Sequence, residues 1–362
     1  MRKLASIQRV REVRSIDGAD SIEVVQINNW NVVAKKGEYS EGDLCIYCEI
    51  DSFLPIREEF EFLRKSSYRK MADGTEGFRL KTIRLRGQVS QGLVLSLSVI
   101  EGPEEMKIGT SRQPWGDQTQ LGPYDDALVI EEGADVTDLL GVVRYDPPVP
   151  ASLQGIAKGP FPSWIPKTDE ERVQNLTDRY GSWRDEDFYL TEKLDGSSAT
   201  FYLKDGEFGV CSRNLDLVET SDNTFWKVAR ELDIEAKLRD LKRGNIAIQG
   251  ELIGEGIQGN PYRLKSQTVK LFGIYDIDHR VYYGMPMFLA TTTHSLKLQT
   301  VPVLKFGMNL PESIDELIQM ADGKSALNPD TDREGLVVRN WDQQSNRISF
   351  KVISNLFLLG EK

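Results

Sequence analysis

The stretch TEKLDGSSATF, residues 191–201, places Lys193 between Glu192 and the pair Asp195-Gly196 and then continues into small and apolar residues. An Asp-Gly pair is typical of a tight turn, and the residues after it predict a strand. Lys193 is therefore either a solvated charge near a turn or a nucleophile. Residues elsewhere in the chain decide between these two interpretations.

The composition is that of a globular protein with room for two domains. The chain has 362 residues, of which 40% are hydrophobic and 28% charged, enough to bury two cores. Its net charge of −11 argues against nonspecific nucleic-acid binding. No apolar run approaches the ~18 residues of a membrane span, and no apolar core of a secretory signal follows the basic N-terminus. We expect a cytoplasmic protein without a membrane partner.

Three cysteines, Cys45, Cys48 and Cys211, are too few for a disulfide framework. Cys45 and Cys48 have the spacing of half a zinc site, but they lie in the strand-like run LCIYCEI. Residues i and i+3 of a strand point to opposite faces, and no second Cys or His pair follows. We therefore expect no metal or redox role, and a reducing compartment.

Short strand-like runs dominate the first segment, up to about Arg144. Several short strands with few helical patterns suggest a small β-barrel. Within it, LRGQVSQGLVLS (residues 85–96) has a basic strand followed by Gly, Ser, Gly and an apolar strand. This pattern resembles OB-fold nucleic-acid-binding modules, so we expect an OB-like barrel.

A basic cluster lies in the same segment, in the run FRLKTIRLRGQ. A strand with alternating basic residues presents them on one face, where they form a track for phosphates. The alternative is a solvated sheet face. The residues concerned are Arg79, Lys81, Arg84 and Arg86.

The proline-rich run YDPPVPAS, residues 145–152, predicts a linker, because proline disfavours regular structure. We expect one domain over residues 1–148 and a second over 149–362. In the second, Asp205-Gly206 predicts a hairpin turn. One helix is expected over residues 221–244, capped by its first or second residue, and another over 311–323. Strand-like runs fill most of the remainder, which predicts an α+β fold with antiparallel sheets.

Four strand-like runs of the second domain each carry one ionisable residue among apolar neighbours. These residues are Lys193, Glu251, Glu334 and Lys351. Each alone has an ordinary explanation, such as a turn or a sheet edge. Burial of an isolated charge costs several kcal/mol unless it is paired or bound to a metal. Their recurrence therefore predicts that the four meet in one cleft and hold a divalent cation and an anionic ligand.

Nucleotidyl transfer through a lysine needs such a set. The amine of Lys193 must be deprotonated to attack, so we expect its pKa to fall from about 10.4 toward neutrality. Lys351 and a bound cation favour the neutral amine. Glutamate oxygens suit a hydrated Mg²⁺ that also binds substrate phosphates. With only His279 and His294 in the chain, a histidine-centred mechanism has little support.

Lys193-Leu194-Asp195-Gly196 resembles the Lys-x-Asp-Gly signature shared by ATP-dependent DNA ligases, RNA ligases and mRNA-capping guanylyltransferases. A single match is weak, but five companion motifs follow in the order of that superfamily. They are Ser212-Arg213-Asn214, Gly250-Glu251-Leu252, Phe272-Gly273-Ile274-Tyr275-Asp276, Glu334-Gly335-Leu336-Val337 and Phe350-Lys351.

The resemblance implies roles for the nucleotide site. Lys193 would form a lysyl-AMP, and Phe272 would stack on adenine. Glu192 and Leu194 would border the adenine through their backbone. Arg213 would contact the ribose or the end of the acceptor strand.

It also implies roles around the phosphates. Glu251 would contact the ribose hydroxyl or a metal-bound water, and Glu334 the water shell of the metal. Lys351 would hold the α-phosphate, and Asp195 would orient the lysine or the metal shell. Many relatives have a second lysine where this chain has Ser349; Arg347 or a residue of the N-terminal domain would supply that charge.

The order of the domains indicates which branch of this superfamily the chain resembles. Only eleven residues follow Lys351, so we expect no C-terminal OB domain, and the barrel-like segment comes first. This order resembles a subgroup of ATP-dependent RNA ligases with an N-terminal OB domain and an antiparallel-sheet, ATP-grasp-like nucleotidyltransferase domain. The resemblance implies ATP and Mg²⁺ or Mn²⁺ as cofactors, and sealing of 3′-OH and 5′-phosphate ends at nicks in RNA-containing duplexes.

Two other functions remain open. A capping-type guanylyltransferase would share Lys193 but use GTP. A non-catalytic OB-fold RNA-binding protein would carry the motifs as relics. Under the ligase interpretation, the basic residues of the first domain contact either nucleic acid or the phosphates of ATP.

Overall fold

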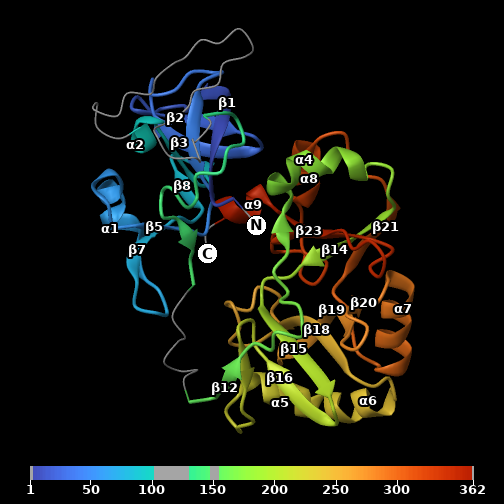
Figure 1. The fold of residues 1–362 in the computed structure, drawn as a ribbon. Coiled ribbons are helices and arrows are strands. Elements are labelled where there is room, and N and C mark those ends of the chain that lie inside the picture. Colours follow the sequence, from blue (N-terminus) through green and yellow to red (C-terminus); the bar gives the residue numbers. More distant parts are fainter. Residues whose placement is uncertain (1–2, 102–129, 147–154, 361–362) are drawn as a thin grey trace. The chain divides into compact units, whose positions relative to one another are not determined.

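The computed structural model describes residues 3–101, 130–146 and 155–360. Clustering of the chain separates two compact units, Met1–Val149 and Pro150–Lys362 (Figure 1). The prolines of the expected linker lie outside the described residues. The domain boundary between residues 148 and 149 therefore stays a prediction.

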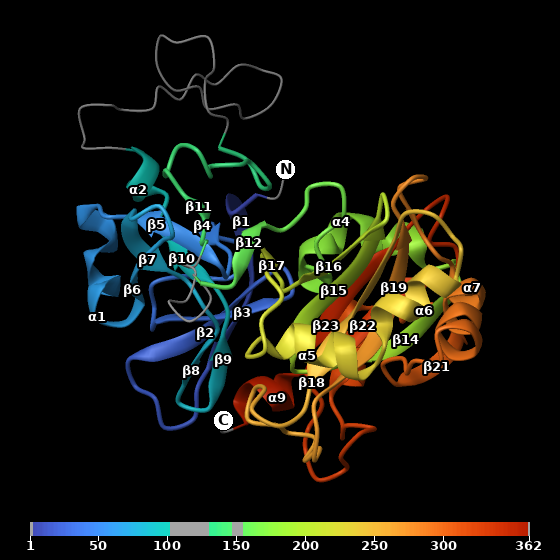
Figure 2. The same cartoon turned by 90° about the horizontal axis from the view of Figure 1, so that it is seen from below.

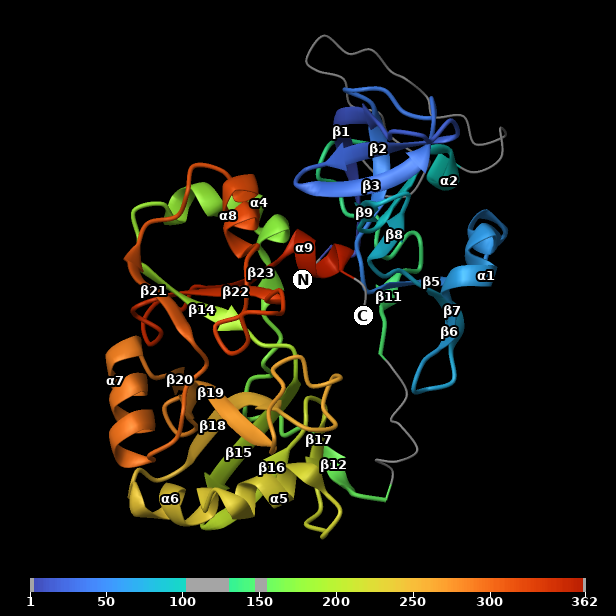
Figure 3. The same cartoon turned by 180° about the vertical axis from the view of Figure 1, so that it is seen from behind.

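The first unit contains a five-stranded antiparallel sheet in the order β10-β4-β1-β2-β3. Figure 3 shows β1, β2 and β3 side by side. A four-stranded sheet, β11-β5-β7-β6, shares a core with it. The strands are β1 Ala5–Ser15, β2 Ile22–Ile27, β3 Trp30–Lys35, β4 Leu44–Cys48, β5 Ser52–Pro55, β6 Tyr68–Lys70, β7 Glu76–Arg79, β10 Leu93–Leu95 and β11 Val143–Arg144; the helices are η1 Glu58–Leu63, α1 Arg64–Ser67 and α2 Ser98–Glu101.

Cys45 and Cys48 point to opposite faces of β4, as the strand period predicts. Cys45 packs in a core with Trp30 and Tyr47, and Cys48 in another core with Phe78. Burial raises the pKa of both thiols to about 12, so they stay protonated and unreactive. Cys211 is also buried and free. The cytoplasmic location expected from the sequence stays a prediction.

The basic stretch does not form one strand, which both interpretations of it, a phosphate track and a solvated sheet face, had assumed. Arg79 ends β7, where it pairs with Asp51 at 2.9 Å. The chain then leaves that sheet and forms the hairpin of β8 (Ile83–Leu85) and β9 (Gln88–Ser90). Arg86, with φ 48°, lies in the hairpin turn. Lys81, Arg84 and Arg86 are exposed.

The second unit is built on two sheets. Seven strands form the antiparallel order β12-β17-β16-β15-β18-β19-β20, and five form β13-β23-β22-β14-β21, in which β13 and β23 are parallel. The strands are β12 Ala157–Pro160, β13 Glu171–Arg172, β14 Phe188–Lys193, β15 Ser197–Lys204, β16 Glu207–Cys211, β17 Leu215–Leu217, β18 Ile246–Ile253, β19 Thr268–Asp276, β20 Val281–Tyr282, β21 Val303–Met308, β22 Gly335–Asn340 and β23 Ser349–Ile353.

The predicted helices form at the expected positions in the chain, but their lengths differ from the prediction. The expected helix over residues 221–244 is two helices, separated by Asp233 in a left-handed conformation with φ 51°. Asn223 caps the first, since its side chain accepts hydrogen bonds from two helical N–H groups. The helix expected over 311–323 covers Ile314–Ala321, with Ser313 as its cap. The predicted Asp205-Gly206 turn joins β15 to β16, with φ of 51° and 82°.

Helices cover one face of each sheet. Those of the first pair, α5 Thr224–Glu231 and α6 Ile234–Asp240, pack on the seven-stranded sheet (Figure 2), and α8 Ile314–Ala321 packs on the five-stranded sheet. The other helices are η2 Val173–Leu176, α4 Thr177–Tyr180, η3 Gly181–Trp183, α7 Met285–Ala290, η4 Thr291–Ser295 and α9 Asn355–Leu359. No helix in the described parts of the chain is long and apolar enough to cross a bilayer.

The two-residue period of the strands puts the charged residues on the faces that these helices leave open. Phe350 and Val352 of β23 pack into the core under α8, so Lys351 points the other way. In β18, Leu252 packs toward α5 and α6, so Glu251 points away from them. Alternation along β18 and β23 thus places Glu251 and Lys351 on the faces that point away from these cores.

Gly335 lets β22 pair closely with β23. Its φ is 153°, and a Cβ there would collide with the Val352 carbonyl and lie 2.9 Å from Cα of Ile353. We predict that Gly335→Ala lowers the free energy of unfolding by about 3 kcal/mol, as measured by denaturant titration. Gly181→Ala, at a site with open space and a helical φ of −60°, is the matched control. Equal stability of the two variants would contradict the prediction.

Candidate active site

Lys193 and Glu334 form a partly buried ion pair. Lys193 ends β14 and lies opposite Gly335 in the β14–β22 ladder, so the preceding residue, Glu334, is beside it. Lys193 Nζ and Glu334 Oε2 are 2.6 Å apart, and the two side chains are 24% and 16% exposed. The midchain lysine therefore meets a carboxylate that follows it by 141 residues.

Gly196 brings a second carboxylate to this pair. A Cβ at Gly196 would lie 2.5 Å from the Leu252 carbonyl oxygen and 2.9 Å from Cγ of Glu251. Only a glycine allows β18 to pass so close to the turn after Lys193. The glycine of the Lys-x-Asp-Gly motif thus sets the distance between the lysine turn and Glu251.

Glu251 lies among like charges. Burial raises the pKa of its carboxyl, Lys193 lowers it, and Glu334 and Asp195 raise it, with a net pKa of about 8. A carboxylate in this position gains from any added positive charge. Glu251, Glu334 and Lys193 therefore form one electrostatic unit, as the sequence predicts.

The predicted fall of the Lys193 pKa is wrong for the ligand-free protein. Burial lowers the pKa of the amine, but the carboxylates of Glu334 and Glu251 outweigh burial and raise it above its ordinary value. The sequence argument counted the positive neighbours of Lys193 without the two negative ones. Without ligands, Lys193 is an ammonium held by Glu334.

Of Lys193 and Lys351, it is Lys351 whose pKa falls. Burial, and next the charges of Lys193 and Arg172, lower the pKa of its amine to about 8. In the sheet register, Lys351 lies opposite Val337, which in turn lies opposite Thr191. Lys193 is two residues beyond Thr191 on the same face. The four residues singled out in the sequence are thus brought together.

Arg172 and Asp169 are site residues that the sequence analysis missed. Arg172 lies opposite Lys351 in the β13–β23 ladder, and Asp169 pairs with Arg213 at 2.7 Å. The strand that carries Arg172 has only two residues, too few for a periodic pattern. Arg213 also lowers the pKa of Lys351, so it belongs to the same cluster.

The residues beside Lys193 are held by their own partners. Glu192 is buried, and its Oε2 accepts a hydrogen bond of 2.8 Å from the Ala326 N–H. Leu194 packs with Tyr262, another residue that the sequence analysis missed. The Tyr262 hydroxyl accepts a hydrogen bond of 2.6 Å from the Asp195 N–H. The lysine turn is therefore anchored on both sides.

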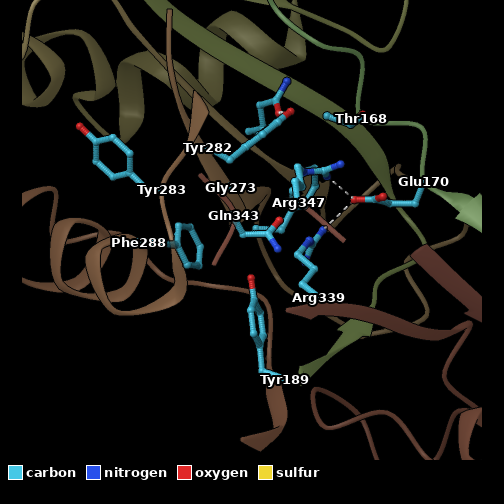
Figure 4. Close-up of a pocket in the computed structure, with 12 residues that line it drawn as sticks. Thr168, Glu170, Tyr189, Gly273, Tyr282, Tyr283, Phe288, Arg339, Gln343 and Arg347 are labelled. Atoms are coloured by element: carbon cyan, nitrogen blue, oxygen red, sulfur yellow. Dashed lines mark hydrogen bonds and ion pairs between the residues drawn. The ribbon is translucent and has the colours of Figure 1, made fainter. Parts of the chain in front are cut away.

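A cavity in the second unit has Phe272 and Arg339 in its lining, but none of Lys193, Glu251, Glu334 and Lys351. Figure 4 shows Arg339 beside Glu170 in this cavity. Ser349, at the motif position where a lysine was expected, donates a hydrogen bond of 2.7 Å to Glu170. Arg347 donates to the same carboxylate at 3.0 Å. Arg347, which the sequence analysis offered for the second positive charge, thus pairs with Glu170. Arg172 and Arg213, which it did not offer for that charge, lower the pKa of Lys351.

The donor set fits a hydrated divalent cation. In residues 3–101, 130–146 and 155–360, no group of three or more His, Cys, Asp or Glu side chains is arranged to hold a metal. Magnesium needs only one or two carboxylates, with waters and substrate phosphates as further ligands. Glu251 and Glu334 supply two carboxylates, and because burial raises the pKa of Glu251, added positive charge would favour its ionised form.

Comparisons with known proteins match both units. A family description of RNA ligases matches residues 186–353, and one of an OB-fold domain matches residues 4–97. The N-terminal OB domain and the following antiparallel-sheet α+β domain are confirmed. No curated protein matches the chain.

Solved structures of the RNA ligase of Naegleria gruberi resemble the whole chain. A variant with AMP and Mn is 38% identical, with a TM-score of 0.79 over 99% of this chain and 98% of that chain. A variant with ATP and Mn is 38% identical, with a TM-score of 0.78 over 98% of each chain. The enzyme with PPi is 39% identical, with a TM-score of 0.77 over 99% of this chain and 98% of that chain.

The raised pKa of Glu251 predicts a pH-dependent stability difference. Because the carboxyl holds its proton up to about pH 8 when folded but ionises near 4.5 when unfolded, it stabilises the fold below 4.5 and this contribution is lost as pH rises to 8. Glu251→Gln should therefore gain Tm relative to wild type between pH 5 and 8, by roughly 2–4 °C. Thermal melts measure this.

The matched control is Glu312→Gln, at an exposed position, whose Tm difference from wild type should not change with pH. A constant difference for Glu251→Gln as well would show that this carboxyl is not perturbed by burial and its neighbours.

Proposed function

The chain belongs to the RNA ligase family, and we propose that it joins 3′-OH and 5′-phosphate RNA ends through a covalent lysyl-AMP on Lys193. It is an ATP-dependent enzyme with Mg²⁺ or Mn²⁺ as its metal cofactor. The enzyme is first adenylylated, AMP then passes to the 5′-phosphate, and the 3′-OH finally displaces AMP and forms the phosphodiester bond.

The pairing of Lys193 with Glu334, beside Glu251 and Lys351, carries this proposal. In the first step the neutral amine of Lys193 attacks the α-phosphorus of ATP. A P–N bond forms, and the bond to the pyrophosphate oxygen breaks. A partly buried lysine with both carboxylates and cations as neighbours suits this reaction.

The side chains around Lys193 have different roles in this step. Lys193 must lose the proton that its pairing with Glu334 stabilises. Glu251 and Glu334 would hold a divalent cation, which would supply positive charge that favours the neutral amine and stabilises the phosphate. Lys351 holds the α-phosphate, and Arg172 beside it adds the second positive charge.

The nucleoside half of the site follows from the neighbouring residues. Phe272 stacks on the adenine, and the backbone of Glu192 and Leu194 borders the base. Arg213 contacts the ribose or the acceptor end. Asp195, whose N–H is held by Tyr262, orients Lys193 or the metal shell. The fixed positions of Glu192 and Asp195 support these roles.

Basic residues of the OB domain are proposed to contact phosphates of the RNA or of ATP. Lys81, Arg84 and Arg86 are exposed on or near the β8–β9 hairpin. A contact with the phosphate backbone of RNA requires such exposure. Arg79 is already paired with Asp51, so it is the weakest member of the group. The substrate is RNA, and a nicked RNA-containing duplex is the proposed form.

Labelled nucleotides test the covalent step. With α-labelled ATP and Mg²⁺, the wild-type protein should retain label through denaturation, and Lys193→Met should lose more than 99% of it, since no other amine replaces a reacting lysine. Labelling by GTP instead would show a capping-type guanylyltransferase. Absence of label, or end joining by Lys193→Met, would support a non-catalytic RNA-binding protein.

A strand-joining assay tests the preference for nicks. RNA with a 3′-OH and a 5′-phosphate should be joined at least tenfold faster at a nick than as free single strands, because the duplex holds the two ends together. Substrates with RNA or DNA on each side of the nick identify the strand that must be RNA. Equal rates for nicks and free ends would overturn the duplex preference.

A further inference from the structure

Phe272 occupies an irregular position in the sheet. In the β18–β19 ladder, Gln249 pairs with Gly273 and Gly250 with Leu271, so Phe272 is the extra residue of a β-bulge. A bulge re-aims a side chain but leaves that residue without a partner in the ladder. The strand alone therefore restrains the Phe272 ring poorly.

Arg339 contacts the ring that the bulge leaves less restrained. Its guanidinium lies over the Phe272 ring, 5.6 Å from the centroid, within the range of a cation–π contact. The ring also packs against the apolar cluster that contains Leu194 and Tyr262. Arg339 comes from β22 of the other sheet, so this contact joins the two sheets at the cavity.

Glu170 holds Arg339 in this position. The Arg339 side chain is only 7% exposed and donates to Glu170 at 3.4 Å. Glu170 also accepts from Arg347 and from Ser349. Burial raises the pKa of Glu170, but Arg339 and Arg347 outweigh burial and keep the pKa below its ordinary value. An ionised carboxylate with three donors is a fixed anchor.

We propose that Arg339, anchored by Glu170, is a positioning residue that holds the Phe272 ring in the orientation that stacks on a purine base. This inference rests on the proposed function, since it needs Phe272 to be the stacking residue. Neither Arg339 nor Glu170 reaches the reacting atoms under this proposal. They affect the affinity for the nucleotide by holding the Phe272 ring in place.

Binding of two ligands separates this role from a general structural one. AMP carries a base, whereas inorganic pyrophosphate does not. We expect Arg339→Met to raise the Kd of AMP about tenfold in calorimetric titrations with Mg²⁺, from loss of the contact and freedom of the ring. The Kd of pyrophosphate should stay unchanged. The full-length protein is first freed of bound AMP with pyrophosphate.

A double-mutant cycle tests whether Arg339 acts through Phe272. In a Phe272→Leu background, Arg339→Met should have no further effect on AMP binding. Additive losses would overturn the proposal, and so would equal losses for AMP and pyrophosphate. If Arg339→Met does not fold, Glu170→Gln and Arg339→Lys carry the test, with smaller losses for AMP alone.

Arg230→Met is the matched control. Arg230 also pairs with a glutamate, Glu219 at 2.7 Å, and lies 5.0 Å over an aromatic ring, that of Trp226, but it is on α5, outside the site. Its loss should leave the AMP affinity at the wild-type value. If wild-type protein binds no AMP, the proposed function fails; if it does and Arg339→Met binds AMP equally well, only this inference fails.

Discussion

The ion pair of Lys193 with Glu334 is the interaction on which the rest of the site depends. The pairing of β14 with β22 places Lys193 opposite Gly335 and so beside Glu334. Gly335 lets β23 come close to β22, and Gly196 lets β18 come close to the turn after Lys193. Charges in such a partly buried place interact more strongly than in water, so every neighbouring group responds to this pair. Glu251 and Lys351 have shifted pKa values for this reason as well as through burial.

The pair also holds the resting enzyme in an unreactive state. Carboxylates outweigh burial at Lys193 and keep its amine protonated, whereas burial and cationic neighbours favour the neutral amine at Lys351. A protonated lysine cannot attack phosphorus. Under the proposed lysyl-AMP mechanism, reaction therefore requires positive charge near Glu334 and Glu251, which would couple the reactivity of Lys193 to the binding of ligands.

The sequence was sufficient for the OB-like barrel, the long strands of the second unit and the convergence of four charged residues. In β14, β18 and β23, alternation places Lys193, Glu251 and Lys351 on the face away from the helices, and Glu334 directly precedes β22. It was insufficient for one helix boundary, one short strand and one pKa shift. The helix break at Asp233 needs a left-handed residue that aspartate adopts only sometimes. Arg172 lies in a strand too short to be recognised, and the direction of the Lys193 pKa shift depends on the distances to two glutamates distant in sequence.

The most direct test of this account is the pKa of Lys193 itself. In NMR spectra of protein with ¹³C-labelled lysine, the signal that disappears in Lys193→Met identifies its side chain. The account predicts that this signal titrates above the ordinary lysine value in the ligand-free enzyme and moves downward when Mg²⁺ and a non-reactive ATP analogue are added. A lysine that is already neutral near pH 7 without ligands, or whose pKa ignores them, would contradict it.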